Sequence, residues 1–350
     1  MDTLAKFYSP RFGRELDGMS NIVTVNGAQE GLYAIITAFC EAGDEVVCVE
    51  PYFDAYKNAC TLVGARPVGV PLRRARDTGH TSDYELDVAE LERALTPRSK
   101  LLVLNTPHNP TGKVFSRDEL EAVAAVVRKH PSLLVLSDEV YEFMCFDGRR
   151  HERFATLDGM WDRTFSLYSA GKTFSATGWR VGYAVAAAHL AGPLLKAHQA
   201  IPFCVATPLE VAVAHAFEAA EREGYFESLP ARLQGNRDML VESLRGAGMA
   251  PIVPEGGYFL MASTDKMAGP SGAAPADAST PDMPLEERRD FHINRWLTRE
   301  VGVTGIPPSA FYSPENRHLA DGIMRFAFCK DEATLAAAGE RLGAFASSAD

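Results

Sequence analysis

The run Ser169-Ala-Gly-Lys-Thr-Phe-Ser-Ala-Thr-Gly-Trp-Arg180 places a hydroxyl, an amine and a guanidinium close together in the chain. The stretch before it, Thr164–Ser169, is mostly apolar and strand-like, and small residues surround Lys172. A lysine in such a setting is reachable and partly desolvated, as an imine-forming amine must be. The side chains of Ser169 and Arg180 are donors suited to a phosphate group. The run therefore predicts a Schiff-base lysine beside a phosphate site.

This combination suggests pyridoxal 5'-phosphate (PLP), although an isolated lysine in a Ser/Gly-rich turn is more often a solvated surface residue. The ring nitrogen of PLP needs a carboxylate, because the protonated ring is the better electron sink. Asp138 and Glu139 follow the continuous apolar run Leu133–Leu136, which is typical of a strand buried on both faces. Open α/β sheets bind ligands at the carboxyl ends of such strands, so we expect Asp138 at the ring nitrogen. Tyr141 is a candidate donor to the phenolic oxygen of the cofactor.

Two other junctions between predicted elements supply polar groups. The predicted strand Lys100–Leu104 ends in a rigid loop rich in proline and glycine, and this loop carries Asn109 as a second donor to the phenolic oxygen. Further upstream, small residues open a predicted helix at Gly27. The backbone N–H groups of Ala28 and Gln29 are therefore expected to bind the phosphate, assisted by the helix dipole. Each of these signals is weak when taken alone.

An aromatic cluster and one arginine complete the candidate site. Phe53 follows the predicted strand Glu45–Val49 and is expected to stack on the pyridine ring, with Tyr52 or Tyr56 as alternatives. Arg325 interrupts an alternating apolar pattern that predicts a half-buried strand. A buried guanidinium must be paired, and its fork geometry fits a carboxylate. Arg325 is therefore the expected clamp for the α-carboxylate of an amino acid, with a structural salt bridge as the alternative.

These motifs together resemble the PLP-dependent aminotransferases of fold type I, from about residue 5 to the C-terminus. More narrowly, the chain is similar to the kynurenine aminotransferase and cysteine-S-conjugate β-lyase group. The resemblance implies that Lys172 holds PLP as an imine and shuttles protons, and that Arg325 and Asn109 bind the substrate. The cofactor contacts that it implies are Lys172, Ala28, Gln29, Phe53, Asn109, Asp138, Tyr141, Ser169 and Arg180.

The resemblance also implies an activity: transfer of an amino group from an L-amino acid, with kynurenine favoured, to a 2-oxo acid such as 2-oxoglutarate. Phe203 matches a substrate-binding aromatic residue that points into the neighbouring subunit's pocket in kynurenine-active relatives. Cys204 replaces the histidine that follows it there, which makes the kynurenine preference less secure. The alternatives are a cysteine-S-conjugate β-lyase, an aromatic or glutamine aminotransferase, or a catalytically weak chain that acts through dimerisation.

The start of the chain departs from the family pattern. Met1 lies in what resembles the first helix of the large domain, whereas relatives carry a preceding segment. In those relatives the segment covers the mouth of the site, contributes contacts to the substrate carboxylate and sends a tyrosine to the partner subunit's phosphate site. Two interpretations follow, a shortened chain or a variant with a more open, weakened site.

Composition and charge narrow the function classes. The chain has 350 residues, 46% of them hydrophobic, and a net charge of −11 without a basic block, so a nucleic-acid partner is not expected. The six cysteines lack zinc-like spacing, so we expect buried thiols in a reducing compartment and no metal site. No apolar stretch is long enough for a membrane helix. The expected location is the cytoplasm, or the mitochondrion if a targeting segment precedes this start.

The order of predicted elements indicates an α/β fold. Strands alternate with helices up to about residue 200, which predicts a mainly parallel central sheet covered on both sides. We expect a large PLP-binding domain over 1–236 and a smaller α+β C-terminal domain over 237–350, assembled as a homodimer. Other expected features are a capping box at Ser116 and Glu119, helices over 208–223 and 230–247, a helix near 285–301, and a mobile loop near 263–284.

Overall fold

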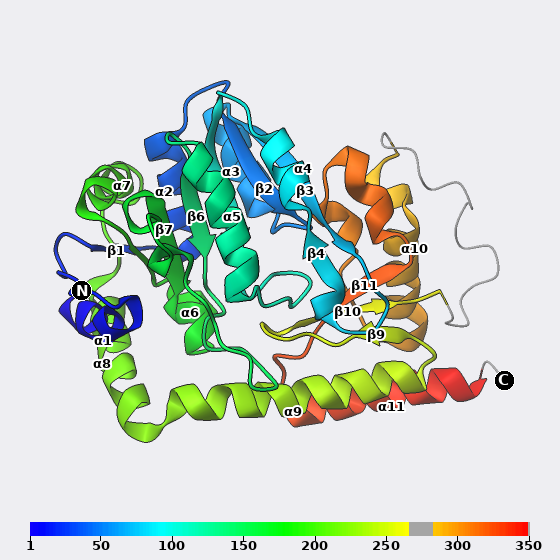
Figure 1. The fold of residues 1–350 in the computed structure, drawn as a ribbon. Helices are drawn as coiled ribbons and strands as arrows, with labels where there is room; N and C mark the ends of the chain where they lie inside the picture. Colours follow the sequence, from blue (N-terminus) through cyan, green and yellow to red (C-terminus); the bar gives the residue numbers. More distant parts are fainter. Residues whose placement is uncertain (266–282, 349–350) are drawn as a thin grey trace.

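The computed structural model describes residues 1–265 and 283–348, with side chains up to residue 345. Two β-sheets form its framework (Figure 1). The strands of the large sheet are β1 (Ile22–Val25), β2 (Glu45–Glu50), β3 (Arg66–Arg74), β4 (Tyr84–Leu86), β5 (Ser99–Asn105), β6 (Leu134–Asp138), β7 (Thr164–Ser169) and β8 (Gly182–Val185). In space they follow the order β1–β8–β7–β6–β5–β2–β3–β4.

The centre of this sheet is parallel, as the sequence predicts. Strand β2 pairs in parallel with β3 and β5, and the parallel pairing continues through β6 to β7. The pairings of β1 with β8, of β7 with β8 and of β3 with β4 are antiparallel. Every residue of β2 is buried, because both faces of the sheet are covered.

Helices cover both faces of the large sheet with apolar side chains. On one face, α2 (Ala28–Phe39), α3 (Ala55–Val63) and α7 (Ala188–Ala200) pack against Val46, Cys48, Leu101 and Val103. On the other face, α4 (Val88–Ala94) and α5 (Arg117–Lys129) pack against Val47, Val49, Leu102 and Leu104. The alternation of these sheet residues explains why the strands read as continuous apolar runs.

The start of α5 confirms a local prediction. The Ser116 side chain accepts the backbone N–H of Glu119, and the Glu119 side chain accepts the backbone N–H of Ser116. This reciprocal capping box satisfies N–H groups that the first helical turn leaves without a partner. The short helix α6 (Ala170–Thr173) follows β7 directly, while α1 (Asp2–Phe12) and α8 (Thr207–Glu223) contribute to a separate aromatic cluster.

A second, antiparallel sheet lies beside the first. Its strands are β9 (Ala250–Ile252), β10 (Phe259–Ser263) and β11 (Ile323–Ala327), with β10 in the centre. Figure 1 shows the long helix α9 (Tyr225–Gly246) running from below the large sheet to the small one, with α11 (Glu332–Ser348) lying along it. The predicted division between 236 and 237 falls inside α9, so one continuous helix joins the two parts.

Two helix predictions need correction. The helix expected from residue 230 begins at Tyr225, because the left-handed Gly224 ends α8 and the next helix starts immediately. Pro230 is tolerated inside α9 near its start. The helix expected near 285–301 is divided into a 3₁₀ turn, α10 (Arg289–Trp296) and a π-helical turn at Leu297–Val301. Other 3₁₀ turns are Thr81–Asp83, Phe154–Thr156, Trp161–Arg163, Thr177–Trp179, Pro308–Phe311 and Pro314–Ala320.

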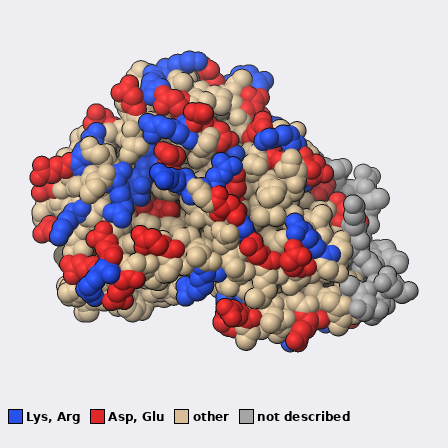
Figure 2. Space-filling view, turned by 60° about the horizontal axis from the view of Figure 1, so that its bottom comes forward, with Lys and Arg blue, Asp and Glu red and all other residues tan. Residues whose placement is uncertain are grey.

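The loop predicted near 263–284 lies mostly outside the described residues, because 266–282 are not among them. None of the described helices is both long enough and apolar enough to cross a membrane. On the face drawn in Figure 2, acidic and basic side chains are interspersed. Binding of an anionic ligand therefore depends on local donors rather than on the net charge of −11.

Candidate active site

A cavity of about 180 Å³ lies where the carboxyl ends of β5, β6 and β7 meet the start of α2. It collects ten of the predicted site residues from segments far apart in the sequence: Ala28, Gln29, Phe53, Asn109, Asp138, Tyr141, Ser169, Lys172, Arg180 and Arg325. Phe203 is absent from this lining, and its side chain is 78% exposed. Its predicted contact with a neighbouring subunit therefore stays a prediction.

Lys172 enters the cavity from α6, one turn after β7 ends. Small residues are needed beside it, because a Cβ on Gly171 would lie 3.1 Å from Cα of Thr177 and 3.2 Å from the Ala176 carbonyl oxygen. The Nζ of Lys172 donates a hydrogen bond to the hydroxyl of Tyr258 at 2.8 Å. The amine is therefore already oriented by a neighbouring side chain.

Asp138 ends β6 and is 7% exposed. Burial raises its pKa from the ordinary 3.8 to about 6, against the opposing effect of a hydrogen bond from Tyr56. The Tyr56 hydroxyl donates to Oδ2 of Asp138 at 2.6 Å. From its place in the sequence Tyr56 is an alternative stacking residue, whereas in the structure its hydroxyl holds the carboxylate of Asp138.

The start of α2 and Arg180 form a cluster of donors. Gly27 precedes the helix, and no side chain among the described residues caps it. A Cβ at Gly27 would lie 2.5 Å from Nη2 of Arg180, so glycine lets the guanidinium approach the helix start. Within the described chain, no carboxylate lies within 4 Å of this guanidinium. These groups, with Ser169 in the same cavity, suit an anionic ligand such as a phosphate.

Arg325 reaches the cavity from β11 of the small sheet and is 8% exposed. Its Nη1 donates to Oδ1 of Asn109 at 2.8 Å, and its guanidinium lies 4.1 Å from the ring centroid of Phe259 and 4.8 Å from that of Phe311. Burial lowers its pKa from the ordinary value. No carboxylate of the described residues lies within 4 Å, so the alternative of a structural salt bridge is not met there. The buried Arg325 guanidinium therefore remains able to bind an anionic ligand.

Two polar residues of the site were not found from the sequence. Asn105 donates from Nδ2 to the Asp138 carbonyl at 2.8 Å and accepts the Asn109 backbone N–H at 2.7 Å, which fixes the loop. It lies at the end of β5, where a site residue could have been expected. Tyr258 lies between two glycines and β10 of the small sheet, and no local pattern connects it with Lys172.

Comparisons with known proteins identify the family of the chain. Residues 2–342 match the family described as aminotransferase class I and II. The kynurenine–oxoglutarate transaminase of Dictyostelium discoideum is 44% identical over 350 residues, covering 97% of this chain and 80% of that protein.

Two solved structures are similar in fold. Bna3p from Saccharomyces cerevisiae, a proposed kynurenine aminotransferase, superposes with a TM-score of 0.91 at 35% identity, over 99% of this chain and 81% of that one. N-succinyldiaminopimelate aminotransferase from Mycobacterium tuberculosis gives a TM-score of 0.86 at 34% identity, over 98% of this chain and 82% of that one. The chain therefore belongs to the aminotransferase class I and II family.

Proposed function

We propose that this chain is a PLP-dependent aminotransferase that moves the amino group of an L-amino acid, foremost kynurenine, to a 2-oxo acid such as 2-oxoglutarate. The observation that carries the proposal is one cavity that holds the Lys172 amine, the buried Asp138 carboxylate and the buried Arg325 guanidinium. The carboxylate of an amino acid could bind Arg325, and its reacting amine and α-carbon would then lie toward Lys172.

The residues present fit PLP. Lys172 would hold its aldehyde carbon, Asp138 its ring nitrogen, Asn109 and Tyr141 its phenolic oxygen, and Phe53 the face of its ring. The phosphate would be bound by Ser169, Arg180 and the backbone N–H groups of Ala28 and Gln29. When bound, PLP supplies an electron sink for the negative charge that develops at the α-carbon. Asp138 suits the protonated ring nitrogen, because no described cation lies within 4 Å of its carboxylate.

Residues of this chain have separate roles in the proposed reaction. Arg325 binds and orients the substrate carboxylate, and the rings of Phe259 and Phe311 shield its guanidinium from water. When the Nζ of Lys172 is not bonded to the cofactor, it can remove the proton from the α-carbon of the substrate and return that proton to another atom of the reacting molecule. Asn109 contacts the guanidinium of Arg325, which leaves its amide nitrogen available for the cofactor or the substrate.

The kynurenine preference rests on two observations. The similar curated protein is named a kynurenine–oxoglutarate transaminase, and the cavity has aromatic walls from Phe53, Tyr56, Tyr141 and Phe259. Fold similarity alone does not select the donor, because an aminotransferase named for another substrate superposes nearly as well. An aromatic wall favours an aromatic donor, since such surfaces stack on the side chain.

The test compares Lys172→Ala with the unaltered chain and with Lys57→Ala, an exposed lysine on α3. With added PLP, the unaltered chain and the Lys57 variant should show a visible absorbance band that falls when L-kynurenine is added. The Lys172 variant should lack the band and lose turnover, because no other described lysine lines the cavity. Near-normal transamination by Lys172→Ala would refute the mechanism, and release of pyruvate from a cysteine conjugate would indicate the lyase instead.

A further inference from the structure

Tyr258 is not among the residues that line the cavity, but it contacts Lys172, which does, and it has no role in the mechanism above. Its ring packs edge-on against Tyr141, with the centroids 5.0 Å apart, and tilts against Phe259 at 4.6 Å. These contacts fix the direction of the ring, and its hydroxyl lies 2.8 Å from Nζ of Lys172. Tyr258 therefore contacts the atom that must form and break bonds in the proposed reaction.

The segment Pro254–Tyr258, which joins β9 to β10, is held on both sides by backbone hydrogen bonds. The N–H groups of Glu255 and Gly256 donate to the Gly112 carbonyl at 3.0 and 2.9 Å, and Gly257 N–H donates to the Met144 carbonyl at 2.8 Å. A Cβ at Gly256 would lie 2.7 Å from the Met144 carbonyl oxygen. The segment is thus pressed between the loop that carries Asn109 and the chain that follows β6.

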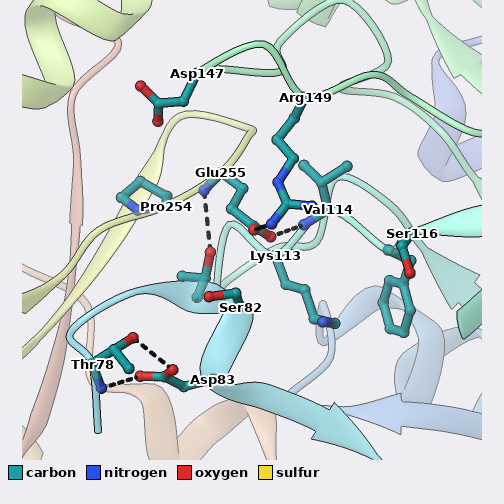
Figure 3. A network of polar contacts seen from close by, with 12 residues as sticks. Thr78, Ser82, Asp83, Lys113, Val114, Ser116, Asp147, Arg149, Pro254 and Glu255 are labelled. Atoms are coloured by element: carbon teal, nitrogen blue, oxygen red, sulfur yellow. Dashed lines mark hydrogen bonds and ion pairs between the residues drawn. The ribbon is translucent and has the colours of Figure 1, made fainter. Parts of the chain in front are cut away.

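The side chain of Glu255 adds a second clamp to this segment (Figure 3). It accepts the Val114 backbone N–H at 3.2 Å and forms an ion pair with Arg149. The Glu255 carbonyl also accepts the Phe146 N–H at 2.8 Å. Because two neighbouring segments, 112–114 and 144–149, hold Pro254–Tyr258, the Tyr258 hydroxyl is placed by rigid structure rather than by an exposed loop.

We propose that Tyr258 is the docking partner of the free Lys172 amine. It accepts a hydrogen bond from Nζ whenever Lys172 is not bonded to the cofactor and so holds the amine in one position at the wall of the cavity. The effect on turnover rests on the proposed function, whereas the contact itself exists without any cofactor. The competing explanation is that Tyr258 is a packing residue whose hydroxyl has no effect on the lysine.

The first experiment uses the cofactor-free chain and the variant Tyr258→Phe, which removes only the hydroxyl. Acylation of Lys172 by acetic anhydride is followed by peptide mass spectrometry, with exposed Lys57 as an internal reference. Loss of the acceptor should free the amine, so Lys172 should react about threefold to tenfold faster relative to Lys57. Unfolding would also raise this ratio, because Lys57 is already exposed in the folded chain and Lys172 is not. The result therefore counts only if Tyr258→Phe keeps the circular dichroism spectrum and the urea midpoint of the unaltered chain, and a faster Lys172 rate in a variant that has lost them does not support the proposal.

The matched control is Tyr225→Phe. The hydroxyl of Tyr225 donates to the carbonyl of Thr173 at 2.8 Å, beside α6 but not to the lysine. Its loss should leave the Lys172 rate within twofold of the unaltered chain. Equal acceleration in both variants would show general loosening of α6 and overturn the proposal, as would an unchanged rate in Tyr258→Phe.

The second experiment uses the chain loaded with PLP. Tyr258→Phe should lower kcat for amino-group transfer about tenfold while KM changes less than threefold, because the substrate carboxylate is bound elsewhere by Arg325. Unchanged kcat would overturn the role in turnover. If the unaltered chain forms no visible band with PLP, the proposed function fails, yet the acylation experiment still decides whether Tyr258 holds Lys172.

Discussion

The carboxylate of Asp138 is buried with neutral hydrogen-bond donors. The Tyr56 hydroxyl lies 2.6 Å from Oδ2, and the Val140 backbone N–H lies 3.4 Å from Oδ1. Burial dominates these contacts and raises the pKa to about 6. In the cofactor-free chain, ionised Asp138 is therefore a cost to stability, which a positively charged ring nitrogen would offset.

Asp138→Asn tests this cost in the cofactor-free protein. Folding raises the pKa of Asp138 from 3.8 to about 6. Between these two pH values the folded protein retains a proton that the unfolded chain has lost. The free energy of unfolding therefore falls as the pH rises from one value to the other. Asparagine does not titrate, so the variant should gain stability relative to the unaltered chain from pH 4 to pH 7. At 1.36 kcal/mol for each pKa unit, the gain is at most about 3 kcal/mol.

The measurement is urea unfolding of both proteins without PLP at several pH values. Other titrating groups are shared, so the difference between the two free energies of unfolding isolates position 138. A difference that stays constant from pH 4 to pH 7 would show that the carboxyl keeps an ordinary pKa.

Some site residues could be predicted from the sequence, and others could not. Lys172, Asp138 and Asn109 could be predicted as site residues because each follows an apolar strand, and strand ends meet at one edge of the sheet. The role of Tyr56 could not be predicted. It lies 82 residues from Asp138 in the chain, and an aromatic residue on a helix is most often a packing residue.

At the scale of elements, the strands predicted at 45–49, 100–104, 133–136 and 164–169 lie within two residues of the observed ends of β2, β5, β6 and β7, because their apolar runs are continuous. No bounds were predicted for β3, β4, β8, β9 and β10, whose apolar runs are shorter or interrupted. The connection between the two sheets could not be predicted in the same way. Tyr258 and Lys172 are 86 residues apart, and their contact depends on how Pro254–Tyr258 packs against the loop after β5. No period or cap in the sequence encodes such packing.

The ion pair between Glu255 and Arg149 should stabilise that connection. Glu255→Gln retains an oxygen for the Val114 N–H but removes the charge, while Arg149 is half exposed and partly screened. We expect each of Glu255→Gln and Arg149→Gln to lower the free energy of unfolding by about 1 kcal/mol. The double variant should lose little more than either single variant, because both remove the same interaction.

Chemical denaturation of the four proteins of this cycle measures the coupling, with the exposed neighbour Arg150→Gln as control. Additive losses in the double variant would mean that the two side chains act independently.

For the whole molecule, we infer from the family resemblance that the active form is a homodimer, and the surface next to the cavity supports this. A second hollow of about 330 Å³ shares Gln29 and Arg180 with the active-site cavity and is also lined by Asn26 and Leu62. Leu62 is 74% exposed. The amide of Asn26 donates to the Cys204 carbonyl at 3.1 Å, which places exposed Phe203 nearby. Large apolar side chains gathered at the mouth of a site indicate a protein interface.

Leu62→Lys tests whether a second copy of the chain covers this surface. Sedimentation equilibrium of the unaltered protein should give twice the 38.1 kDa mass of one chain. A lysine near the C-terminal end of α3 suits the helix dipole, so the fold should persist while a charge enters the interface. We expect dimer dissociation to increase at least about tenfold, equivalent to roughly 1.4 kcal/mol. The control Met239→Lys, on α9, should remain dimeric.

An unaltered chain that is monomeric at micromolar concentration would refute the dimer, whereas a dimer insensitive to Leu62→Lys would place the interface elsewhere.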